Sequence, residues 1–155
     1  IGIYLEQPCT SYEECFSIRK HTNHPFILDE CMDSINMLMR GYNDNAMDVV
    51  NLKINRIGGL TKAKQFRDLC VTLGIHMTIE DAWGGEIATS AIAHLAHSTP
   101  TAYHFQSSAF HEYTNVEIAK GGPVIKDGFM YASDLPGLGV EPNYKVLGNP
   151  IEEVK

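Results

Sequence analysis

The sequence predicts an α/β fold built on a mainly parallel sheet. Short runs of β-branched and aliphatic residues alternate with longer amphipathic segments, the pattern of repeated strand–helix units. A polar or charged residue follows each apolar run, at intervals of about 23 to 28 residues. The 155 residues, 44% hydrophobic and 20% charged, have the composition of one ordinary globular domain or a piece of one.

Five apolar runs have the length and composition of buried strands. They cover residues 2–5, 25–28, 49–52, 76–79 and 102–105. Between them, four segments carry apolar residues at helical spacing. They cover residues 11–20, 33–40, 61–73 and 86–97.

Local signals support the ends of these helices. Thr10 or Ser11 is a good N-cap for the first helix, and Glu13 and Glu14 in its first turn suit the positive end of the helix dipole. Gly74 after the third helix is a suitable left-handed stop. From about residue 113 the chain is richer in Gly, Pro and Asp, which predicts an irregular closing segment with short strands.

The residues that end the strands carry the functional prediction. Parallel strands all point the same way, so residues at their carboxyl ends gather on one face. In a (β/α)₈ barrel the active site lies on that face. The strand-end residues here are Glu6, Asp29, Glu30, Lys53, Glu80, Asp81, Gln106, Ser107 and Ser108.

Converging carboxylates require a cation, because they cannot all stay ionised without one. Oxygen ligands suit Mg²⁺, and Glu6 and Asp29 are the predicted ligands. We expect the cation and burial to lower the pKa of the adjacent Lys53 enough for it to act as a base. A substrate carboxylate on the ion would have an acidified α-proton. The predicted reaction is therefore abstraction of a proton α to a carboxylate.

Four segments resemble a known family. They are YLEQPC (4–9), FILDE (26–30), NLKINRIGGLTKA (51–63) and IEDAWGGEIATSAIAHLAHSTP (79–100). They are similar to the C-terminal barrel half of the enolase superfamily, in the mandelate racemase/muconate lactonizing enzyme group. The last segment most resembles the cis-3-hydroxyproline dehydratase and hydroxyproline betaine 2-epimerase branch.

The resemblance implies a division of the chain. Residues 1–112 would form about strands four to eight of a TIM barrel, and residues 113–155 the closing segment. By the same resemblance, we expect the N-terminal capping domain and barrel strands one to three of this group to lie outside this chain. The implied activity is that of a Mg²⁺-dependent dehydratase, racemase or epimerase acting on an amino-acid or proline-like acid. Which of these reactions occurs stays open.

The resemblance also implies roles for the strand-end residues. Glu6 and Asp29 would bind the metal, Glu30 would orient neighbouring carboxylates, and Lys53 would be the acid/base on the sixth strand.

Three further residues would contact the substrate by the same resemblance. Asp81 would bind the substrate ammonium, Trp83 would flank a cationic nitrogen, and Ser107 would line the pocket from the eighth strand. From the residues alone, Asp81 as a helix N-cap and Trp83 as a packing residue stay open.

An incomplete barrel has unpaired sheet edges and an uncovered apolar interior. We therefore expect the chain to require the missing half, in another chain, or to self-associate. The first metal aspartate and the Lys-x-Lys motif of the family lie in the missing strands. The alternative function is a non-catalytic half-barrel that binds a partner chain or itself.

Composition excludes other classes of function. The 12 basic and 19 acidic side chains give a formal net charge of −7, which argues against a nucleic-acid partner. No apolar stretch approaches the length of a membrane span. Four cysteines without a C-x-x-C pair indicate reduced thiols and a cytoplasmic location. Two weaker alternatives are zinc at His94 and His97, against packing of a helix end, and phosphate at the glycine pair 84–85.

Overall fold

A computed structural model of the protein describes residues 2–80 and 83–153. Its centre is a five-stranded parallel sheet in the order β1-β2-β3-β4-β5. The strands are β1 (Leu5–Glu6), β2 (Phe26–Leu28), β3 (Val49–Lys53), β4 (His76–Glu80) and β5 (His104–Ser107). This sequential parallel order is that of consecutive barrel strands, as predicted.

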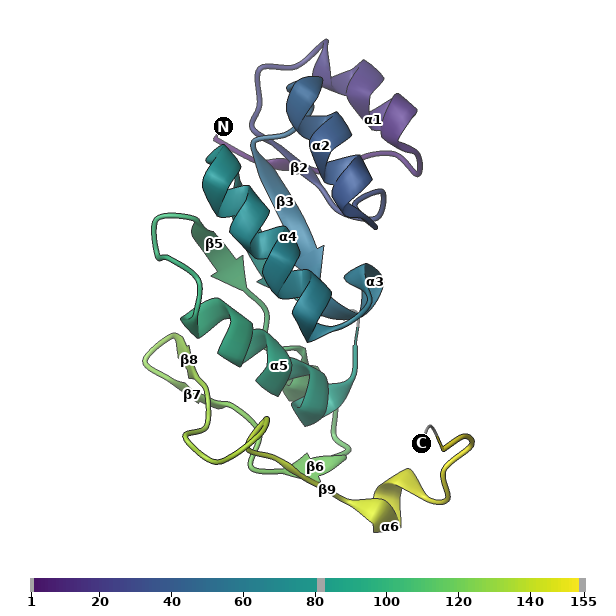
Figure 1. Cartoon of the computed structure of the whole chain (residues 1–155), viewed down its shortest axis with the longest axis vertical. Helices are drawn as coiled ribbons and strands as arrows, with labels where there is room; N and C mark the ends of the chain where they lie inside the picture. The colour runs from purple at the N-terminus through teal and green to yellow at the C-terminus, as the bar shows by residue number, and fades with distance from the viewer. Residues whose placement is uncertain (1, 81–82, 154–155) are drawn as a thin grey trace.

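Helices pack on one side of the sheet (Figure 1). The four longer ones are α1 (Tyr12–Arg19), α2 (Ile35–Asn43), α4 (Leu60–Leu73) and α5 (Gly85–His97). Figure 1 shows α4 and α5 in front of the sheet, with α1 and α2 together at the top of the view. Ser11 begins α1 with a capping box to Glu14, and Gly74 ends α4 in the left-handed conformation. One short helix, α3 (Ile54–Ile57), follows β3 directly and was not predicted.

The core lies between the sheet and these helices. Successive strand residues point to opposite faces, and the helix-facing set is fully buried, for example Leu28, Val50 and Met77. The alternate residues of β3 and β4, including Asn51, Lys53 and Thr78, lie on the other face, which corresponds to the barrel interior.

The two edge strands of the sheet are β1 and β5. The sheet curls so far that Tyr4, just before β1, contacts Phe105 of β5, with ring centroids 4.9 Å apart. Both rings remain partly exposed, Tyr4 at 47% and Phe105 at 39%. In the described part of the sheet, β1 and β5 each pair with one neighbour only, so the sheet has two unpaired edges, as the sequence predicts.

The rest of the chain has little regular structure. It contains η1 (Phe110–Tyr113), β6 (Ala119–Lys120), β7 (Val124–Lys126), β8 (Phe129–Tyr131), β9 (Glu141–Pro142) and α6 (Tyr144–Leu147). Buried Glu86 at the start of α5 accepts hydrogen bonds from the backbone N–H groups of Ile118 and Ala119, which ties this segment to the barrel. None of the described helices has the length and apolar character needed to cross a bilayer.

Candidate active site

Four charged side chains meet at the carboxyl ends of four neighbouring strands. Glu6 ends β1, Asp29 follows β2, Lys53 ends β3 and Glu80 ends β4. Lys53 and Glu80 are register partners across β3 and β4. The structure thus brings Glu6, Asp29 and Lys53 together, as the strand-end spacing predicts, although they are far apart in the sequence.

Lys53 lies between two carboxylates. Its Nζ is 2.9 Å from Asp29 Oδ2 and 3.2 Å from Glu80 Oε1. The side chains are only 11%, 5% and 13% exposed for Lys53, Asp29 and Glu80 respectively. An ammonium held this deeply beside two carboxylates is a candidate proton donor or acceptor rather than a surface charge.

Two further residues hold these carboxylates, and sequence reasoning missed both. Arg56 Nη1 donates to Asp29 Oδ1 at 2.5 Å and to the Asp29 carbonyl oxygen at 2.7 Å. Asn51 Nδ2 donates to Glu6 Oε1 at 2.8 Å and to Glu80 Oε1 at 3.2 Å. The only sequence signal for these residues is their spacing from Lys53. Asn51 lies two residues before Lys53, on the same face of the strand, and Arg56 lies three residues after it.

The charges in this cluster shift one another's pKa values. Burial alone would lower the pKa of Lys53, but its hydrogen bonds and ion pairs with Asp29 and Glu80 outweigh burial and raise it. Burial opposes ionisation of Asp29, yet Arg56 and Lys53 hold its pKa below the usual value. Burial raises the pKa of Glu80, and the negative charges of Asp29 and Glu6 add to that rise against the opposing effect of Lys53.

The raised pKa of Lys53 differs from the lowered pKa that the sequence predicts. The predicted lowering assumed that a nearby divalent cation repels the ammonium. In the structure, Asp29 and Glu80 contact the ammonium directly and raise the pKa of Lys53. Lys53 is therefore protonated in this state, with Asp29 and Glu80 as its counter-ions.

The donor set of the cluster fits a hard divalent ion. Glu6, Asp29 and Glu80 each offer a carboxylate oxygen, and these oxygens lie within 4.8 Å of one another. Carboxylate oxygens that converge in this way are the ligands that Mg²⁺ prefers. Glu80 thus joins the two predicted ligands as a third candidate.

The other predicted site residues lie at varying distances from this cluster. Glu30 is exposed, and among the described residues no hydrogen bond or ion pair joins it to Glu6, Asp29 or Lys53. Its role in orienting the carboxylates stays a prediction. Ser107 ends β5 and its Oγ is 2.8 Å from His104 Nε2.

The region after β4 carries the remaining predictions. Asp81 lies outside the described residues. Trp83 is 61% exposed and stacks on Phe110, with ring centroids 5.2 Å apart, and Tyr113 lies against both rings. The residue at the N-cap of α5 is Gly84.

The two histidines for which zinc was an alternative contact backbone carbonyls instead. His94 Nε2 lies 3.3 Å from the Leu138 carbonyl oxygen, and His97 Nε2 lies 3.1 Å from that of Met130. Both contacts attach the closing segment to α5, in agreement with the packing interpretation.

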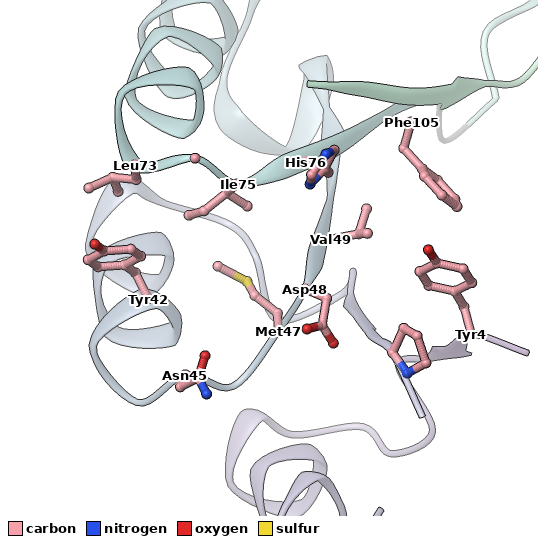
Figure 2. Close-up of a pocket in the computed structure, with 12 residues that line it drawn as sticks. Tyr4, Tyr42, Asn45, Met47, Asp48, Val49, Leu73, Ile75, His76 and Phe105 are labelled. Carbon is pink, nitrogen blue, oxygen red and sulfur yellow. The ribbon is translucent and has the colours of Figure 1, made fainter. Parts of the chain in front are cut away.

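A cavity lies at the opposite end of the sheet. It has a volume of about 590 Å³ and is lined by residues at the amino ends of β3 and β4, among them Asp48, Val49 and His76, together with Tyr4 and Phe105. Figure 2 shows these side chains around the cavity. Because conserved chemistry in such barrels occurs at the carboxyl ends of strands, we assign the site to the carboxylate cluster and not to this cavity.

Comparisons with known proteins agree with this geometry. Residues 3–146 match the family described as enolase C-terminal domain-like. A cis-3-hydroxy-L-proline dehydratase from Roseibium aggregatum is 55% identical over 151 residues, which cover 97% of this chain and 41% of that protein.

Solved structures give the same result. A mandelate racemase/muconate lactonizing enzyme from Roseovarius nubinhibens ISM has a TM-score of 0.94 and 41% identity, over 98% of this chain and 41% of that one. A member of the enolase superfamily from the same organism, complexed with magnesium, has a TM-score of 0.91 and 36% identity, over 97% of this chain and 41% of that one. The chain therefore spans about 41% of the length of these relatives. The resemblance read from its motifs is confirmed, and the chain belongs to the enolase C-terminal domain-like family, with the mandelate racemase/muconate lactonizing enzymes as structural neighbours.

Proposed function

We propose that this chain forms the C-terminal barrel part of a Mg²⁺-dependent enzyme that abstracts a proton α to a carboxylate. The observation that carries the proposal is the buried Lys53 ammonium, in contact with Asp29 and Glu80 inside a group of three carboxylates. The magnesium in a structural neighbour supports the choice of ion. When bound, Mg²⁺ would supply positive charge that stabilises the negative charge developing on the substrate carboxylate.

In this proposal Glu6 and Asp29 hold the ion, Glu80 is a further candidate ligand beside them, and Lys53 moves the proton. Lys53 can accept a proton only when its Nζ is neutral. The pairs with Asp29 and Glu80 keep it protonated, so the charged form of Lys53 would be less favoured where these carboxylates serve as ligands instead. Burial then favours neutral Lys53. The same side chain would thus change from counter-ion to base.

The substrate class follows from the relatives. The protein from Roseibium aggregatum is named for dehydration of cis-3-hydroxy-L-proline, so we propose an amino-acid or proline-like acid as the substrate here. In a dehydration of this kind the base takes the α-proton, the bond between the adjacent carbon and its hydroxyl breaks, and a carbon–carbon double bond forms. The hydroxyl leaves as water after it takes up a proton, which the protonated base can return, so that no net proton is gained or lost. Racemisation and epimerisation share the first step and return a proton instead.

The predicted contacts with the substrate belong to this proposal. Asp81 would pair with the substrate ammonium, and the exposed Trp83 ring would lie against the cationic nitrogen. Ser107 would contribute a hydroxyl from the end of β5.

The test is exchange of the substrate α-proton in D₂O, followed by ¹H NMR with cis-3-hydroxy-L-proline and Mg²⁺. It should be done with the longest natural form of the protein that contains this chain. We expect exchange that EDTA abolishes and that Lys53→Ala abolishes. Exchange at the normal rate in the Lys53→Ala variant would refute the role of Lys53.

The second candidate function is a non-catalytic half-barrel. The two unpaired sheet edges, β1 and β5, favour it. The isolated 155-residue chain should then form a dimer or higher assembly, or bind the segment of the Roseibium aggregatum protein that it does not match. Size-exclusion chromatography with light scattering measures the mass. A soluble, folded monomer of 17.2 kDa would contradict this function and the expected need for a partner.

A further inference from the structure

Asn51 occupies a central position beneath the charged cluster. It lies in β3, two residues before Lys53 on the same face of the strand, and is only 1% exposed. Its side-chain nitrogen donates to Glu6, which comes from β1, and to Glu80, which comes from β4. One amide group therefore joins carboxylates from two strands that are not neighbours in the sheet.

The two hydrogen bonds fix the orientation of the amide. Both partners are acceptors, so the nitrogen of Asn51 must face the carboxylates, and its oxygen faces away. Asn51 Oδ1 is buried and has no hydrogen-bond partner among the described residues. The side chain leaves its own acceptor unsatisfied while it makes both bonds to the glutamates.

The contacts also determine which carboxylate oxygens remain available. Asn51 and Lys53 both bond to Oε1 of Glu80, and Asn51 bonds to Oε1 of Glu6. Within the described part of the chain, neither Oε2 atom has a hydrogen-bond or ion-pair partner. Each glutamate is thus held by one oxygen and presents the other.

We propose that Asn51 is a positioning residue for the ion site, whose amide fixes the carboxylates of Glu6 and Glu80 in the arrangement that receives a divalent cation. This inference rests on the proposed function. A neutral amide suits the task because it screens the repulsion between two carboxylates and adds no charge that would repel the ion. An apolar side chain of similar size would fill the same space but leave the two carboxylates to move apart.

The direct test is the affinity for Mn²⁺, used as a probe of the magnesium site and measured by electron paramagnetic resonance on the longest natural form of the protein. Asn51→Leu removes both donors and keeps the branched shape and the number of side-chain heavy atoms. We expect its Kd for Mn²⁺ to rise about 10- to 100-fold, the usual effect of losing a partner that orients a metal ligand.

Thr78→Val is the matched control. Thr78 is the register partner of Asn51, is also buried, and its hydroxyl also has no hydrogen-bond partner in the described structure. The substitution changes the same layer of the barrel without touching a carboxylate. We expect Thr78→Val to bind Mn²⁺ with wild-type affinity.

The outcomes separate the two proposals. Wild-type affinity in Asn51→Leu would overturn the positioning role and leave the proposed function intact. Equal weakening in Thr78→Val would also overturn it, because the effect would then come from loosened packing. Absence of Mn²⁺ binding by the wild-type protein would overturn the proposed function, and with it this inference.

A second measurement applies if Asn51→Leu does not fold. In the wild-type protein, the side-chain amide protons of Asn51 should exchange slowly with solvent and shift in NMR spectra when Mg²⁺ is added. Rapid exchange, or no shift at saturating Mg²⁺, would overturn the inference.

Discussion

Replacement of Lys53 by methionine removes the ammonium and keeps a side chain of similar length. Nζ of Lys53 lies 2.9 Å from Asp29 and 3.2 Å from Glu80. At an effective dielectric constant of about 20, the shorter pair alone has a Coulomb energy of roughly 6 kcal/mol. Desolvation offsets much of this energy, and loss of one partner from a buried pair costs about 3–5 kcal/mol. Because Arg56 still pairs with Asp29, we expect about 3 kcal/mol.

Urea unfolding in EDTA and in Mg²⁺ measures this effect. In EDTA, Lys53→Met should lower the free energy of unfolding by about 3 kcal/mol. In Mg²⁺ the loss should shrink, because the ion replaces the ammonium as the counter-charge for the carboxylates. The rate of α-proton exchange should fall about 10²- to 10⁴-fold, as expected for loss of a general base.

Lys64→Met is the control for the loss of one positive charge. Lys64 is an exposed lysine on α4 that pairs with Asp68 four residues later, an interaction usually worth about 0.3–0.5 kcal/mol. A Lys53→Met protein as stable in EDTA as this control, or one with normal exchange of the α-proton, would refute the assignment of Lys53 as a buried counter-ion and base.

Three further predictions concern stability and reactivity. Arg67 is 4% exposed and donates to a carbonyl and two hydroxyls at the end of α5. Arg67→Met should therefore lower the free energy of unfolding in urea by about 2–3 kcal/mol. A loss under about 0.5 kcal/mol would contradict this role. Burial lowers the pKa of His104. Its contribution to the free energy of unfolding should therefore be complete above pH 6.5 and be lost as the pH falls through the lower pKa of the folded state. His104→Asn should reduce the dependence of the free energy of unfolding on pH in this range, and an unchanged dependence would exclude His104 as its source. Burial raises the pKa of the Cys70 thiol to about 12. Iodoacetamide at pH 8, with labelling read by mass spectrometry, should therefore modify Cys70 only after unfolding. Rapid labelling of the native protein would disprove its burial.

Most of the fold could be predicted because apolar runs recur at an even spacing, although only β2 and β3 are buried along their whole length. The strand predicted over residues 49–52 extends by one residue to Lys53, and the helix predicted over 61–73 begins one residue earlier. The last strand lies two residues later than predicted. Its pairing with β4 shifts register between Met77 and Thr78, and apolar periodicity carries no signal for such a shift.

The short helix α3 could not be predicted, because four residues contain barely one turn and show no helical period. It matters for the site, since it carries Arg56 back toward Asp29.

The charged members of the site were easier to predict than the residues that hold them. Glu6, Asp29 and Lys53 stand out because each is a charge at the end of an apolar run. Asn51 lies inside such a run. The sequence does not show whether a polar residue at such a position holds other side chains by hydrogen bonds or makes no specific contact. Only the structure shows that its amide reaches two carboxylates from different strands.

The charge balance of the cluster links these contacts to the proposed chemistry. Three carboxylates face two cations, Lys53 and Arg56, so the ion-free cluster retains one negative charge. A divalent ion would change that to one positive charge if both cations kept their protons. A buried group tends to lose net charge, and an arginine does not deprotonate in proteins, so Lys53 is the group that can release a proton. Release would leave the cluster neutral and Lys53 able to accept the α-proton of a substrate. The carboxylates that keep Lys53 protonated in the absence of the ion are therefore the same groups that would allow Lys53 to act as a base when the ion is bound.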